Sequence, residues 1–270
     1  MCLPNNRRQP SIRQALTLIE MLIAMSVVSL MTVSLGALAH AVKISSDYTE
    51  GTTNATQHAR VAFERISSAV GQGLASESFP GAIVFADTVG SWTYPDTLVV
   101  WHPTGAAANP TGMPQFNEIV IYCPNPAIPS QLLEITSPTD TRVVPAITDL
   151  ATWSTELANL KTGVASQKVL ITDLVRTATP TAGTVARGAV RFEVELHPTA
   201  TDWANFRAGT LAFSGVPWVQ GIYGSQTGLQ QTWVRGELQL MPGYNLPSDP
   251  SGQVAIAFLG SAALYWNLHQ

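Results

Sequence analysis

Residues 21–42 form a run of 22 residues without a formal charge, and His40 is the only ionisable side chain among them. About 20 apolar residues are enough for a helix to cross the hydrocarbon core of a bilayer. Pro10 lies before the run and its first glycine is Gly36, so no strong helix breaker interrupts its beginning. We therefore predict one membrane-spanning helix over residues 16–42, about 40 Å long at 1.5 Å per residue.

The charges on the two sides of this run differ. Three arginines and no acid precede it within the first fifteen residues (Arg7, Arg8, Arg13), whereas Asp47 and Glu50 follow soon after it. The positive-inside rule places the N-terminus in the cytoplasm and the C-terminal part outside. The chain has 14 Lys and Arg in total, so the part after these three arginines has 11 basic residues and 18 Asp and Glu. This acidic balance argues against a general nucleic-acid surface.

Two simple interpretations compete for the N-terminal segment. A secretory signal peptide would be cleaved after Ala41, where Ala39 and Ala41 form an A-x-A site, but its apolar core normally runs about 7–15 residues. A plain uncleaved anchor fits the length and the flanking charges. It leaves Glu20 unexplained, because ionisable residues within membrane segments usually have a functional partner.

The sequence around Glu20 carries a resemblance. Residues 15–20, "ALTLIE", followed by the apolar residues 21–25, resemble the processing site of type IV pilins and type II secretion pseudopilins. The resemblance implies that a leader of residues 1–15 is cut off between Ala15 and Leu16, and that the new amine of Leu16 is N-methylated. Ala15 replaces the family's usual Gly before the cut. Ala37 stands where major pilins commonly have a proline, which favours a minor component.

The same resemblance implies a structural role without catalysis or cofactor. Glu20, the fifth mature residue, would form an ion pair with the amine of a neighbouring subunit's first residue during assembly into, or at the tip of, a filament. The implied partners are a prepilin peptidase, other pilins or pseudopilins, an inner-membrane assembly platform driven by a cytoplasmic ATPase, and membrane lipid before assembly. The chain would be a single-pass inner-membrane protein with a periplasmic or extracellular C-terminal domain.

Beyond the span the helix is expected to continue over residues 43–74, with Gly51 as a bend and Gly71 as a stop. A helical stripe of small and apolar residues supports this (Ala55, Ala59, Ala62, Ile66, Ala69). The stretch "HARVAFERISSAVGQG" resembles PilW-like minor pilins and J-type minor pseudopilins. We predict that this half is amphipathic and packs against a domain.

Residues 75–270 are predicted to form a mostly antiparallel β-sheet domain, which makes the fold class α+β. Seven β-branched or alternating runs bounded by turn residues indicate strands at 81–87, 96–102, 117–123, 131–137, 167–173, 188–197 and 232–241. One helix is expected between them, capped by Asp149, ended by Gly163 and apolar on one face (Leu150, Trp153, Leu157, Leu160).

Patterns typical of catalytic or metal sites are missing from the sequence. The histidines His58, His102, His197 and His269 are scattered, and no G-x-S-x-G, phosphate-binding loop or C-x-x-C occurs. Asp140, Asp149 and Asp173 suit capping or turn roles better than a calcium loop. Cys2 and Cys123 are expected on opposite sides of the membrane, so we predict no intramolecular disulfide.

Three classes of function remain open, with a pilin or pseudopilin subunit favoured. A binding module is the second, and residues 214–224, "SGVPWVQGIYG", would be its exposed loop unless the tryptophans mainly fill the core. An anchored enzyme is the third, and it would require a cleft that brings His102 or His197 together with an acid.

Overall fold

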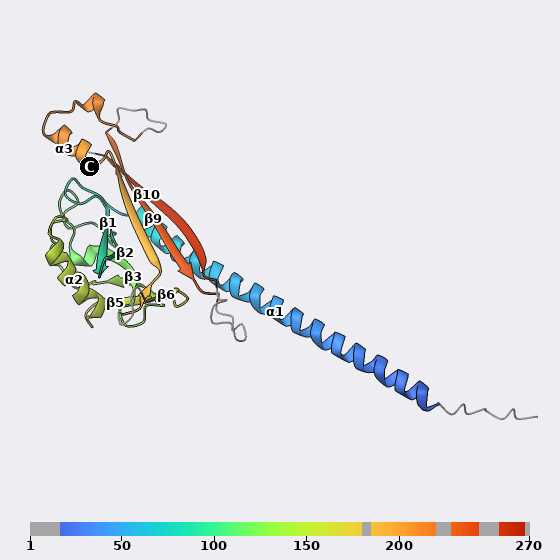
Figure 1. Ribbon diagram of the computed structural model, residues 1–270. Coiled ribbons are helices and arrows are strands. Elements are labelled where there is room, and N and C mark those ends of the chain that lie inside the picture. Colours follow the sequence, from blue (N-terminus) through green and yellow to red (C-terminus); the bar gives the residue numbers. More distant parts are fainter. Residues whose placement is uncertain (1–16, 180–184, 220–227, 243–253, 268–270) are drawn as a thin grey trace, which may run out of the picture. The chain divides into compact units, whose positions relative to one another are not determined.

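The computed structural model describes residues 17–179, 185–219, 228–242 and 254–267. The chain divides into two compact units, Met1–Thr49 and Glu50–Gln270. The fold is α+β, as predicted: a long N-terminal helix and antiparallel sheets (Figure 1).

Helix α1, Leu18–Gly71, runs through 54 residues and contributes to both units. In its first half, the hydroxyl groups of Ser26, Ser29 and Thr32 donate hydrogen bonds of 2.8 Å to backbone carbonyls three or four residues earlier. This leaves the outer surface of the segment apolar. In the second half the predicted stripe is confirmed, since all five of its residues are buried. The helix continues through Gly51 and ends at Gly71, the predicted stop.

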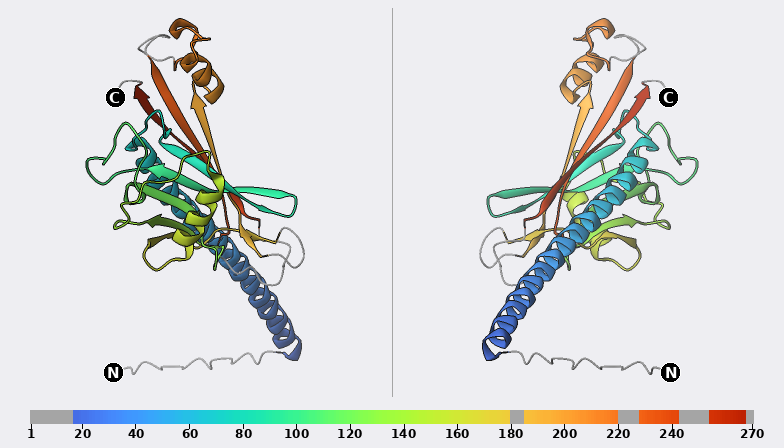
Figure 2. Two further views of the ribbon diagram at one scale, coloured as in Figure 1. Left: turned by 90° about the vertical axis from the view of Figure 1, so that its left-hand side faces the viewer. Right: turned by 90° about the vertical axis from the view of Figure 1, so that its right-hand side faces the viewer.

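Five strands form one antiparallel sheet in the order β1-β2-β3-β4-β5. They are β1 Ala82–Val89, β2 Trp92–Trp101, β3 Ile119–Pro124, β4 Leu132–Thr136 and β5 Gln167–Thr172. Alternation along β2 serves two cores: Leu98 and Val100 pack with α1, whereas Val99 and Trp101 pack with helix α2, Leu150–Thr162. The sheet therefore has one helix on each face (Figure 2).

A second antiparallel sheet has the order β10-β9-β8, from strands β8 Val190–His197, β9 Leu229–Leu240 and β10 Ile256–Asn267. Its inner face joins the core that contains α1. There Gly236 of β9 pairs with Gly260 of β10, and both approach the Phe63 ring. The opposite face carries exposed side chains, including Leu259 at 80% exposure.

Short elements complete the second unit. Strands β6, Thr177–Ala178, and β7, Arg187–Gly188, pair with each other, and the turns η1, Phe116–Glu118, and η2, Phe213–Gly215, are single 3₁₀ turns. Helix α3, Ala200–Arg207, lies at the end of the ribbon formed by β8 and β9 (Figure 2).

All seven predicted strands are confirmed within a few residues, and so is α2, with Asp149 as its N-cap and Gly163 as its C-cap. The expectation that Leu150 faces the core is wrong. Leu150 is 64% exposed, whereas Trp153, Leu157 and Leu160 are buried as expected. The reason is its place as the first helical residue, where it lies at a cleft instead of over the sheet.

Besides the short elements, the structure contains a strand and a helix that were not predicted from the sequence, β10 and α3. Strand β10 reads "IAFLGSAALYWN", in which apolar or small residues occupy both faces, so the period of two is hidden. The start of helix α3 could have been predicted from Thr199, a residue type that often caps helices. In the structure Thr199 accepts a hydrogen bond of 3.2 Å from the Asp202 backbone N–H, as an N-cap does.

Candidate functional site

The first turn of α1 places Glu20 in a reciprocal set of hydrogen bonds with Thr17. Oε2 of Glu20 accepts hydrogen bonds of 2.8 Å from both the backbone N–H and the hydroxyl group of Thr17. The Glu20 backbone N–H points back to Oγ1 of Thr17 at 3.4 Å. This is the geometry of a capping box, which satisfies backbone N–H groups that have no partner within the helix.

The carboxylate of Glu20 has a free oxygen in this arrangement. Both hydrogen bonds to its carboxylate use Oε2, and within residues 17–179 and the other described ranges Oε1 accepts no hydrogen bond. The side chain is fully exposed. A negative charge in the first turn of a helix also interacts favourably with the helix dipole. Glu20 is therefore held by its own chain on one side and open to a cation on the other.

The predicted cleavage residues Ala15 and Leu16 lie outside the described residues. Thr17 begins the described part of the chain, so the geometry of the processing site itself stays a prediction.

Large apolar side chains are exposed along the first half of α1. Leu18 is 81% exposed and Val33 is 70% exposed, and the best 18-residue window has a mean hydropathy of 2.1 with no residue buried. Patches of this kind mark surfaces that lipid or another protein covers. By length and composition this helix can cross a membrane, and an N-terminal signal sequence meets the same criterion.

A long apolar N-terminal helix whose second half packs on antiparallel sheets is now established. The architecture is pilin-like. Comparisons of the chain with protein-family models, curated proteins and solved structures give no match. The likeness therefore rests on the architecture, and any more specific role has to be argued from the residues.

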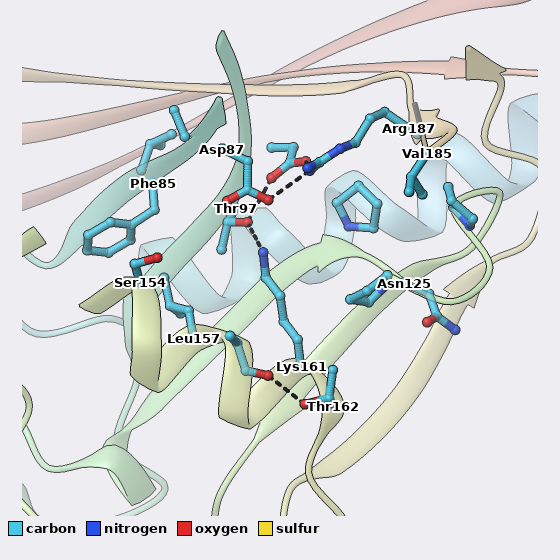
Figure 3. A pocket seen from close by; sticks show the side chains of 18 of the residues that line it. Phe85, Asp87, Thr97, Asn125, Ser154, Leu157, Lys161, Thr162, Val185 and Arg187 are labelled. Atoms are coloured by element: carbon cyan, nitrogen blue, oxygen red, sulfur yellow. Dashed lines mark hydrogen bonds and ion pairs between the residues drawn. The ribbon is translucent and has the colours of Figure 1, made fainter. Parts of the chain in front are cut away.

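The second unit contains a cleft of about 600 Å³ beside α2 (Figure 3). Its walls come from β1, β2, α2, the turn after β3 and β7. Four charged side chains line it: Asp87 from β1, Asp96 from β2, Lys161 from α2 and Arg187 from β7. None of the four was predicted as a site residue, because they come from four separate elements.

The charged side chains of the cleft form a continuous chain of contacts. Lys161 Nζ donates to Thr97 Oγ1 at 2.7 Å, and that hydroxyl donates to Asp96 Oδ1 at 2.8 Å. Arg187 NH1 lies 2.7 Å from Asp87 Oδ2 and 3.7 Å from Asp96 Oδ2. Figure 3 shows the Lys161 and Arg187 side chains reaching towards Thr97 and Asp87.

Burial changes the acid–base properties of this region. The Asp96 side chain is 5% exposed, and desolvation raises its pKa against the opposing effect of nearby Lys161. On β3, burial raises the pKa of the Cys123 thiol to about 12. Because only the thiolate is a strong nucleophile, Cys123 is an inert core residue at neutral pH.

Two of the aspartates singled out in the sequence, Asp149 and Asp140, have structural roles. Asp149 accepts a hydrogen bond from the Thr152 backbone N–H at 3.2 Å, which confirms its capping role. Asp140 binds Arg142, whose guanidinium also reaches Glu156 at 3.0 Å. Across the described ranges, no three His, Cys, Asp or Glu residues are grouped so that they could hold a metal ion.

His58 and several tryptophans also have packing partners. His58 Nδ1 is 2.9 Å from Thr172 Oγ1, so this half-buried histidine links α1 to the end of β5. Trp101, Trp153 and Trp218 are almost fully buried, which confirms a core role for these three, whereas Trp92 is 59% exposed. Trp218 contacts the rings of Trp203, Phe206 and Phe213. In the predicted loop 214–224, residues 220–224 lie outside the described residues.

Proposed function

We propose that this chain is a structural subunit, a minor pilin or pseudopilin, that is cleaved after Ala15, N-methylated at Leu16 and assembled into or at the tip of a type IV pilus or type II secretion pseudopilus. The observation that carries the proposal is a single helix with two different halves. Its first half exposes apolar side chains behind an acidic first turn, and its second half lies in the core of a β domain.

We assign a different role to each part of the chain on the basis of these two halves. Residues 1–15 act as leader, residues 16–42 cross the inner membrane before assembly, residues 43–74 continue the helix, and residues 75–270 form the β-rich domain outside the cytoplasm. A prepilin peptidase, an assembly platform and other pilins would act on the N-terminal segment. Lipid or neighbouring helices would cover its apolar side chains, since water is a poor solvent for them.

Glu20 is the residue that sets the position of one subunit against the next. Its Oε1 atom is available to a neighbour's N-terminal amine while Oε2 still caps its own helix. A charge in an apolar core without a partner is strongly penalised, even where the completed pair adds little net stability. The pair therefore selects the correct axial offset between subunits more than it strengthens the filament.

Two substitutions separate the charge of Glu20 from its capping role. Glu20→Gln keeps an acceptor for the Thr17 N–H but removes the charge, whereas Thr17→Ala removes the hydroxyl from the capping box but keeps the charge. We expect Glu20→Gln to be inserted in the membrane normally and to be lost from sheared filaments, at least tenfold by immunoblot, because an unpaired amine in the core is strongly disfavoured. Thr17→Ala should remain in filaments.

The matched control is Glu50→Gln, which removes an acid from the same helix outside the apolar segment and should assemble as the wild type does. Determination of the N-terminal mass of each variant in the membrane fraction shows whether its processing differs from that of the wild type. Normal incorporation of Glu20→Gln would contradict the assigned ion pair. Loss of Thr17→Ala with normal Glu20→Gln would instead make the helix cap the essential feature.

A further inference from the structure

The cleft beside α2 has the size and lining of a ligand site. Its volume of about 600 Å³ lies within the range of small-molecule pockets, about 300–1,000 Å³. Apolar side chains form part of its walls, among them Phe85 from β1, Leu157 from α2 and Val185, which lies just before β7. Charged and hydroxyl groups from β1, β2, α2 and β7 lie among these apolar side chains, where they can orient a ligand through hydrogen bonds.

An irregularity between β1 and β2 aims an acid into the cleft. Phe85 pairs with Thr97 and Asp87 pairs with Tyr94, so Pro95 and Asp96 together lie opposite the single residue Ala86. Pro95 has no N–H to donate to the ladder. In a regular strand Asp96 would lie on the same face as Leu98 and Val100 and would point towards α1. The bulge instead places Asp96 beside Thr97 on the wall of the cleft.

Asp96 lies between the two cations of the cleft. Thr97 connects it to Lys161, and Arg187 approaches its other oxygen at 3.7 Å. At 3.7 Å the buried Asp96 carboxylate and the Arg187 guanidinium do not form a tight ion pair. Asp96 therefore acts mainly by positioning its neighbours.

The cations retain unused hydrogen-bond donors. Lys161 is half-buried and has three N–H groups, of which one reaches Thr97, and among the described residues it forms no ion pair. Arg187 has five N–H groups, and its hydrogen bond to a described residue uses NH1 alone. Both cations of the cleft therefore keep N–H donors that can bind the oxygens of an anionic group.

The surrounding charge limits how negative that group can be. Asp87 and Asp96 both lie close to Arg187, so a dianionic phosphate would be repelled by two carboxylates. A carboxylate has a single charge and two oxygens, which can accept from an ammonium and a guanidinium at the same time. The apolar walls require a hydrocarbon body next to it.

We propose that this cleft binds a carboxylate group attached to an apolar body, with Lys161 and Arg187 on the carboxylate and Phe85, Leu157 and Val185 on the body. The C-terminal end of a polypeptide with an apolar last residue and a free organic acid share this chemistry. The proposal concerns the second unit alone and does not depend on filament assembly.

Titration calorimetry on the full chain in a non-ionic detergent tests the proposal with three probes: an acetylated tripeptide ending in phenylalanine with a free carboxylate, the same peptide as its C-terminal amide, and 3-phenylpropionate. We expect saturable binding of a free carboxylate and binding of the amide weaker by about tenfold or more, the effect of one charge-assisted contact. Binding of the peptide alone identifies a polypeptide terminus as the source, whereas equal binding of 3-phenylpropionate identifies a small acid.

Lys161→Met should weaken binding by about tenfold or more, and Lys161→Arg should restore part of it, because the charge returns. The matched control is Lys168→Met, which removes an exposed lysine whose Nζ contacts the Gly163 carbonyl. Thermal unfolding of each variant shows whether it is folded. If Lys161→Met does not fold, Lys161→Gln replaces it as the variant without the charge. The proposal is overturned if no free carboxylate binds, if the amide binds equally well, or if folded Lys161 variants without the charge keep the wild-type affinity.

Discussion

At the scale of single residues, two carboxylates have opposite surroundings. Glu20 is fully exposed and stabilised by Thr17 donors at the start of a helix, whereas Asp96 is buried beside Thr97 and Arg187. The charged form of Glu20 has little desolvation cost in water, whereas the charged form of Asp96 is disfavoured by desolvation. Glu20 is thus suited to meet a cation from outside, and Asp96 to organise cations inside its own domain.

The raised pKa of Asp96 predicts a pH dependence of stability. The unfolded chain loses the proton near the ordinary aspartate pKa of about 3.9, but the folded chain loses it only at higher pH. Between the two values the folded state holds more protons, so the stability that this group contributes is present below the window and falls as pH rises through it. Asp96→Asn cannot ionise and should lack this decline.

The measurement is thermal unfolding of wild type and Asp96→Asn at several pH values from about 3.5 upwards. The wild type should lose stability relative to the variant as pH rises through the window. A difference between the two that stays constant with pH would show that Lys161 and Arg187 cancel the effect of burial on the Asp96 pKa, and one that moves in the wild type's favour would show that they outweigh it.

At the scale of elements, the packing of α1 depends on small residues on both sides. The helix contributes Ala55, Ala59 and Ala62, and the opposing sheet contributes Gly236 and Gly260. A Cβ added at Gly260 would lie 2.7 Å from Cε1 of the Phe63 ring and closer still to two other ring atoms. The phenylalanine of the helix therefore fits against the sheet only because two paired strands lack side chains at this position.

Gly260→Ala should destabilise the second unit by about 1–3 kcal/mol, the usual cost of overpacking a core. In a Phe63→Leu background the same change should cost less, because the two sites share one space. Gly105→Ala is the matched control, since a Cβ there has nothing within 4 Å. Denaturant unfolding of the four variants and the wild type measures these differences, and equal effects of Gly260→Ala in both backgrounds would refute the contact.

Features that depend on residues close together in the chain could be predicted from the sequence, whereas features that depend on residues far apart in the chain could not. The alanine stripe of α1 and the alternation of β8 are local periodicities, and the Asp149 cap lies next to its helix, so each was predictable. The cleft was not. Lys161 and Thr97 are 64 residues apart, Arg187 and Asp87 are 100 apart, and the bulge that turns Asp96 exists only once β1 and β2 have paired.

At the scale of the whole molecule, two units with different requirements share one helix. The unit Met1–Thr49 exposes apolar side chains that need lipid or other subunits around them, whereas Glu50–Gln270 buries its own two hydrophobic clusters. A chain of this kind is expected to exist in a membrane first and in an assembly later, with Glu20 near the start of the helix in both states.

We propose that the leader is removed ahead of Leu16 so that the helix can enter a filament. Intact-mass and N-terminal peptide mass spectrometry of the protein isolated from cells shows where the mature chain begins. We expect a chain that begins at N-methyl-Leu16. A chain that begins at Val42 would show simple secretion after Ala41, and a chain that keeps Met1 would show an uncleaved anchor; either result would contradict it.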